Sequence, residues 1–194
     1  MSHRMRIAPW LSLLASVASL SCRQDKPKEQ GAACDLRVQG TRIEYKGHVL
    51  PFPGPLASWE QALGAHWRTA DSLDVHILDD IGLYALTAPR ETEVRGFAIV
   101  LNARGDANPL RKTPSYYPRS TFKGRLCVDG SVIAPSSTVA DLNRDKEGQP
   151  FKRGYLDRIY SYDIVATPTN IYVRIDLTDE GTPESFAMEL SGSK

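Results

Sequence analysis

The chain has 194 residues, of which 24 are Lys or Arg and 23 are Asp or Glu. This near-neutral balance argues against nucleic-acid binding, which needs concentrated positive charge. The length suits one domain of about 100–200 residues rather than several.

The first residues predict a secretory signal peptide. Arg4 and Arg6 precede a stretch, residues 7–21, that is apolar and carries no charge. As a helix this stretch would reach only about 22 Å at about 1.5 Å per residue, whereas a hydrocarbon core is about 30 Å thick. Its length and flanks are therefore typical of a secretory signal.

The end of that stretch, Ala18–Cys22, resembles the lipobox of bacterial lipoproteins. We expect cleavage before Cys22 and lipidation of Cys22, with palmitate or similar acyl chains holding the protein on a membrane, because two or more chains make anchoring stable. Arg23 follows where the inner-membrane retention signal places Asp, so the resemblance implies the outer membrane, facing the periplasm. An ordinary signal peptide with a chance cysteine, or an uncleaved anchor, is the alternative.

The rest of the chain is expected to form a tether and one domain. Residues 24–31 are polar and charged and include a proline, which predicts a flexible connection. The expected organisation is a signal peptide at 1–21, a lipidated tether at 22–33 and a single domain at 34–194. Cys34 and Cys127 remain if Cys22 is lipidated, and an even remainder in an oxidising compartment predicts a disulfide bond. Two buried free thiols are the alternative.

The domain is predicted to be α+β, with a predominantly antiparallel β-sheet and one or two short helices. An apolar stripe of Leu56, Trp59 and Leu63 between Pro55 and Gly64 predicts one helix, and a second short helix is expected at 137–142. Turns are predicted at Asp79–Gly82 and at Asp129-Gly130. Alternating or apolar runs predict strands at 41–46, 48–50, 73–77, 83–87, 94–101, 122–128, 132–133, 156–165, 171–177 and 186–190.

A loop expected at 102–120 carries the main candidates for partner binding. Tyr116 and Tyr117 lie in it with Arg111 and Arg119, and Tyr and Arg are typical anchors of protein interfaces. In the alternative interpretation, this is a proline-stiffened loop whose tyrosines cover the sheet.

Asp141, Asn143 and Asp145 form a weak calcium candidate, because oxygen ligands at alternate positions suit a hard cation. The match then fails, since Lys146 occupies the position of the turn glycine and Lys152 the position of the closing Glu. A solvated polar loop is the competing interpretation. No cofactor is expected, and the Asp79-Asp80 pair is interpreted as part of a turn.

Several stretches together resemble an uncharacterised family of bacterial domains, over about residues 42–142. This family is common in lipoproteins and in proteins suspected of immunity roles against contact-delivered toxins. The arrangement is also distantly similar to BamE-like and β-lactamase-inhibitor-like envelope domains, which are binding or scaffold modules, so the resemblance implies no catalytic residues. The stretches are Tyr45–Phe52, Leu56–Gly64, Leu78–Tyr84, Val94–Leu101 and Phe122 with Gly124.

These patterns lead us to expect a non-enzymatic envelope lipoprotein that binds another envelope protein or a toxin, in the latter case as an immunity or inhibitor protein. An assembly or scaffold lipoprotein is the first alternative. A small periplasmic hydrolase is the second, because catalytic triads assemble in space rather than in sequence, although the G-x-S-x-G elbow is missing.

Overall fold

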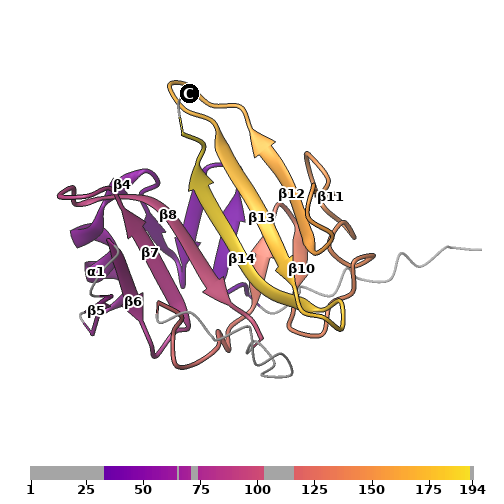
Figure 1. The fold of residues 1–194 in the computed structure, drawn as a ribbon, viewed down its shortest axis with the longest axis horizontal. Helices are drawn as coiled ribbons and strands as arrows, with labels where there is room; N and C mark the ends of the chain where they lie inside the picture. The colour runs from indigo at the N-terminus through magenta and orange to yellow at the C-terminus, as the bar shows by residue number, and fades with distance from the viewer. Residues whose placement is uncertain (1–32, 65, 71–73, 103–115, 193–194) are drawn as a thin grey trace, which may run out of the picture. The chain divides into compact units, whose positions relative to one another are not determined.

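The computed structural model describes residues 33–64, 66–70, 74–102 and 116–192, which contain two β-sheets and one helix (Figure 1). The five-stranded sheet has the order β10-β9-β1-β2-β3. Every neighbouring pair in it is antiparallel except β1 and β9, which run parallel. Its strands are β1 (Leu36–Gln39), β2 (Arg42–Tyr45), β3 (His48–Leu50), β9 (Leu126–Val128) and β10 (Ser131–Ile133).

The nine-stranded sheet has the order β11-β12-β13-β14-β8-β7-β6-β5, and β4 also pairs with β8. All of its pairs are antiparallel, which confirms the predicted fold class. Its strands are β4 (Gly54–Pro55), β5 (Arg68–Thr69), β6 (Val75–Leu78), β7 (Leu83–Thr87), β8 (Glu93–Val100), β11 (Lys152–Arg153), β12 (Ile159–Ile164), β13 (Ile171–Leu177) and β14 (Pro183–Leu190).

The described residues contain one helix, α1 (Leu56–Leu63). Pro55 is its N-cap rather than its first helical residue, and Gly64 ends it with a positive φ of 102°. Trp59 is fully buried and donates a hydrogen bond from its indole Nε1 to the carbonyl of Pro51 at 2.9 Å. No helix within the described ranges is long and apolar enough to cross a membrane.

The second helix expected at 137–142 is not formed. The segment makes successive turns, with the N–H of Asp141 donating to the carbonyl of Thr138 at 2.9 Å. The Asp141 carboxylate in turn accepts hydrogen bonds from the N–H and the hydroxyl of Thr138, at 2.7 and 2.8 Å. Such side-chain bonds to the local backbone compete with a helix, which explains why the prediction was wrong.

The core lies between the inner faces of the two sheets. Leu36, Val38 and Ile43 come from the five-stranded sheet, and Phe97 and Phe186 from the nine-stranded one, and all belong to one cluster of fully buried side chains. Burial of apolar surface is the dominant favourable contribution to folding, so the two sheets depend on each other.

A disulfide joins Cys34 to Cys127, with the two Cα atoms 5.9 Å apart, and this confirms the predicted bond. Cys34 precedes β1 and Cys127 lies in β9, so the bond fastens the two parallel neighbours beside their hydrogen bonds. The two cysteines are 93 residues apart in the sequence, and strands β4 to β8 of the nine-stranded sheet lie between them.

We expect the double variant Cys34→Ala, Cys127→Ala to unfold more easily in urea than the native chain. Closing a loop of this length restricts the unfolded chain, and removing such a bond lowers the free energy of unfolding by about 2–4 kcal/mol. The native chain measured with a reductant is the matched control and should behave like the variant. Equal urea midpoints for the oxidised native chain and the variant would contradict a stabilising role.

Candidate functional site

The outer face of the nine-stranded sheet, which is turned away from the shared core, carries a second apolar cluster. Tyr84 on β7 is a buried member of this cluster, and Tyr116 and Tyr117 pack against it. These three residues, called the tyrosine cluster below, bring the end of the predicted recognition loop onto the sheet. The other buried members are Ala70, Val75, Ile77, Ala98, Val100 and Ala187.

The rings of the tyrosine cluster contact one another closely. The Tyr84 centroid lies 5.6 Å from that of Tyr116 and 6.0 Å from that of Tyr117, and the latter two rings are 5.5 Å apart. Burial raises the pKa of Tyr84 well above its ordinary value. Tyr116 and Tyr117 remain half-buried, so they cover the sheet and still expose part of their surface, and their role in partner binding stays a prediction.

Asp79 in the β6–β7 turn fixes the position of this loop. The Arg68 guanidinium donates two hydrogen bonds to its carboxylate, at 2.7 and 3.1 Å, and a third to the carbonyl of Tyr117 at 3.0 Å. The N–H of Arg119 also donates to Asp79, at 2.8 Å. The hydrogen bond from Arg68 is the main reason that the pKa of Asp79 lies below its ordinary value.

The structure describes one of the two arginines that are predicted to bind a partner. Arg119 has a side chain that is 82% exposed, with its Nε 3.8 Å from the Asp79 carboxylate. Its guanidinium is therefore available to a partner at little desolvation cost. Arg111 lies outside the described residues.

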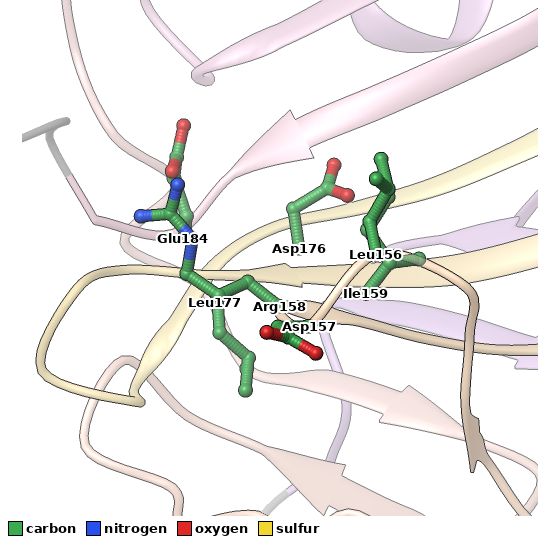
Figure 2. Close-up of a pocket in the computed structure, with 7 residues that line it drawn as sticks. All are labelled: Leu156, Asp157, Arg158, Ile159, Asp176, Leu177 and Glu184. Carbon is green, nitrogen blue, oxygen red and sulfur yellow. The ribbon is translucent and has the colours of Figure 1, made fainter.

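Tyr117 connects the tyrosine cluster to a pocket on the same sheet. Its hydroxyl donates to the Glu184 carboxylate at 3.1 Å, and Glu184 lines a cavity of about 460 Å³. We call this cavity the β12 pocket, since β12 begins in its wall. Figure 2 shows the residues that line it: Leu156, Asp157, Arg158, Ile159, Asp176, Leu177 and Glu184.

Asp176 is held in place beside the pocket by polar neighbours on the outer face. The hydroxyl of Ser185 donates to its carboxylate at 2.9 Å, and the Arg174 Nε lies 3.5 Å from it. Arg174 also pairs with Glu189 at 3.1 Å. Burial tends to lower the pKa of Arg174, but the charges of Asp176 and Glu189 raise it overall, so this guanidinium stays charged.

A projecting hairpin tip forms one wall of the β12 pocket, and sequence reasoning did not single it out. The N–H of Gly154 donates to the carbonyl of Ile159 at 2.7 Å, which closes the turn between β11 and β12. Tyr155 at this tip is 101% exposed and Leu156 is 59% exposed. The strand predicted at 156–165 began at Leu156 and therefore concealed this turn.

Asp129, Lys146 and Tyr162 form a buried charged cluster that the sequence did not reveal. The Lys146 side chain is 2% exposed and its Nζ lies 2.7 Å from the Asp129 carboxylate. The Tyr162 hydroxyl donates to the same oxygen at 2.7 Å, and the Lys146 ammonium lies 4.2 Å from the centroid of the Tyr162 ring. Burial opposes ionisation of Asp129, but the hydrogen bonds from Lys146, Gly40 and Tyr162 lower its pKa overall.

The weak calcium candidates serve the local chain. Asp141 accepts the hydrogen bonds from Thr138 and pairs with Arg144 at 2.6 Å. The Asn143 side chain bonds both backbone groups of Phe151, at 2.7 and 3.0 Å, and Asp145 is exposed with a φ of 57°. Within the described ranges, no group of three or more His, Cys, Asp and Glu side chains could hold a metal ion.

His76 on β6 and the acidic pair Asp79-Asp80 in the turn that follows have different surroundings. His76 lies 3.3 Å from the Thr87 hydroxyl, and burial lowers its pKa. Asp79 is paired with Arg68, whereas Asp80 is exposed beside a different cavity. The expected turn at Asp79–Gly82 is formed between β6 and β7.

The fold is therefore a two-sheet α+β domain. Its sequence matches the family described as a domain of unknown function (DUF7738) over residues 35–143. Because the match covers more than half of the chain, the protein belongs to that family, and the predicted resemblance to an uncharacterised domain family is confirmed. No curated protein and no solved structure matches the chain significantly.

Changing Lys146 to Met should destabilise the domain strongly at neutral pH. The variant leaves the buried Asp129 carboxylate without its cation, and breaking such a pair costs about 3–5 kcal/mol. Lys152→Met is the matched control, because Lys152 is exposed on β11. Urea unfolding at pH 7 measures both, and an equal loss in the two variants would contradict the role of Lys146.

The pH dependence of the same variant tests the electrostatics. A carboxyl group whose pKa is lowered in the folded state stabilises the fold fully above its ordinary value, near 3.8 for Asp129. This contribution is lost as the pH falls through the lower folded value. Without Lys146, burial should raise the pKa of Asp129 in the folded variant, so this carboxyl group is protonated at a higher pH there than in the native chain. The difference in unfolding free energy between the native chain and Lys146→Met should therefore shrink as the pH falls through the acidic range in which Asp129 is protonated, and a constant difference would refute the assignment.

Proposed function

We propose that this protein is an outer-membrane lipoprotein facing the periplasm, whose domain is a non-enzymatic protein-binding module. The observation that carries the proposal is the bond between Cys34 and Cys127. Disulfides persist mainly in oxidising compartments, which favours an exported domain. The chain has three cysteines, so Cys22 has no other cysteine of the chain to bond with and is left for lipidation within its lipobox-like sequence.

The protein-binding part of the proposal is supported by the outer face of the nine-stranded sheet. The tyrosine cluster, the exposed guanidinium of Arg119 and the β12 pocket all lie there or at its edge. Tyr and Arg are enriched among the residues that dominate interface energetics. A rigid sheet that carries such groups suits recognition of another protein.

Among binding roles, a toxin-neutralising immunity or inhibitor protein is favoured over an assembly scaffold. A scaffold that docks through apolar surface needs a broad apolar patch. The exposed large apolar residues of the described chain instead come from separate segments, and Tyr155-Leu156 is a local protrusion beside a cavity. This pattern fits insertion into a partner's cleft. The exposed residues are Val49, Val132, Val139, Tyr155, Leu156 and Val165.

The variant Cys22→Ala should lose acylation and membrane attachment. Cells fed an alkyne-labelled palmitate should incorporate the label into the native chain and not into this variant, because the thiol that carries the acyl chains is absent. Cys127→Ala is the control and should stay labelled. Membrane anchoring of Cys22→Ala would overturn the lipobox assignment.

Replacing both Tyr116 and Tyr117 by Ala should weaken capture of the partner from envelope extracts by about tenfold or more, as expected for anchor residues. The variant Tyr116→Phe, Tyr117→Phe keeps the ring contacts and controls for lost packing. Thermal unfolding checks that both variants fold. Unchanged capture by a folded Ala variant would remove the tyrosine cluster from the interface.

A further inference from the structure

We propose that the β12 pocket receives a lysine or arginine side chain of a protein partner, while Tyr155 and Leu156 pack against apolar surface beside that side chain. This inference rests on the protein-binding part of the proposed function and names its surface and the chemistry of its partner. It does not depend on lipidation of Cys22.

The shape and lining of the pocket suit a long side chain that ends in a cation. Leu156 and Ile159 give it an apolar wall, against which an aliphatic stem can pack, whereas the Leu177 side chain lies on the opposite side of the strand from the Asp176 carboxylate. Lys and Arg side chains bury their methylene groups along such surface and keep the charged end in a polar environment. The cavity of about 460 Å³ has room for one such side chain and water.

The charges around the pocket favour a cation. Asp157, Asp176 and Glu184 line it, and Arg158 is the cation in the same wall. The Arg158 guanidinium is already paired with Asp179, which lies outside the lining. Of the carboxylates in the lining, Asp157 is paired with Arg153 at 2.8 Å and Glu184 accepts a hydrogen bond from Tyr117 at 3.1 Å. Asp176, whose contact with the Arg174 Nε is 3.5 Å, is therefore the carboxylate that favours a cation here.

Asp176 is the best placed acceptor for the incoming cation. A carboxylate offers about four lone-pair sites. Ser185 uses one of them at 2.9 Å, and the Arg174 Nε approaches only to 3.5 Å. In Figure 2, Asp176 lies between Glu184 and the Leu156–Ile159 wall, so a cation bound there could leave its stem on that wall.

The hairpin tip supplies the apolar part of the contact. Tyr155 is fully exposed and Leu156 is mostly exposed, so the described residues leave most of both side chains uncovered. The tip is short and closed by the hydrogen bond from Gly154 to Ile159, and Arg153 pairs with Asp157 across it at 2.8 Å. A preorganised loop loses little conformational entropy on binding, so these two side chains can act as anchors.

The test uses a peptide probe with a matched neutral analogue. The domain of residues 33–194 contains both sheets, both apolar clusters and the disulfide, so it is labelled with ¹⁵N and titrated with acetyl-Leu-Lys-Leu-amide. The control probe, acetyl-Leu-norleucine-Leu-amide, has the same stem without the charge. We expect the lysine probe to shift the amide signals of residues 155–159, 176 and 177, with the neutral probe at least about tenfold weaker.

Two variants separate the parts of the proposal. Asp176→Asn should weaken the lysine probe about tenfold and leave the neutral probe unchanged. Tyr155→Ala should weaken both probes, and it changes an exposed residue, so the domain should stay folded. Equal affinity of the two probes, or shifts located away from the pocket, would overturn the proposal. If the native chain captures a partner from envelope extracts but the probe does not bind, only the pocket assignment fails; if no partner is captured, the protein-binding proposal itself fails.

Discussion

Burial of the Phe97 ring between the two sheets is the packing interaction on which the rest of the fold depends. Its centroid lies 5.7 Å from that of Phe52, 5.2 Å from that of Trp59 and 6.1 Å from that of Phe186. These partners come from the segment after β3, from α1 and from β14, so one ring joins three distant parts of the chain. Removing a buried ring of this kind costs about 3–5 kcal/mol, a large part of the stability of a single domain.

The same core shows that the structural domain extends beyond the family match. The match ends at residue 143, yet β14 (Pro183–Leu190) pairs with β8 in the middle of the nine-stranded sheet. Without β14, β8 would expose a long strand edge, and such edges promote aggregation. The buried ion pair of Asp129 and Lys146 adds a second connection across residue 143. Residues on both sides of this boundary therefore share one core and one polar cluster.

Local features of the fold could be predicted from the sequence, and long-range ones could not. The alternation of β13 and the turn at Asp129-Gly130 were predicted correctly, because each depends on neighbouring residues. The parallel pairing of β1 with β9 and the contact of Lys146 with Tyr162 join residues far apart in sequence. Among the site residues, the disulfide was predictable because few cysteines leave few pairings. The tip at Tyr155 was missed because apolar residues there continue the pattern of β12 although the backbone turns.

The β12 pocket lies outside the part of the chain that matches the family. All of its lining residues lie between Leu156 and Glu184, after the family match ends at residue 143. The matched region supplies β8, Phe97 and the tyrosine cluster's Tyr84, which support the strands that carry the pocket. Family membership thus identifies the structural framework of the domain. The proposed ligand chemistry depends on the two C-terminal hairpins, β11–β12 and β13–β14. A member with the same scaffold and different residues at the positions of Asp176 and Tyr155 would keep the fold and lose the preference for a basic partner.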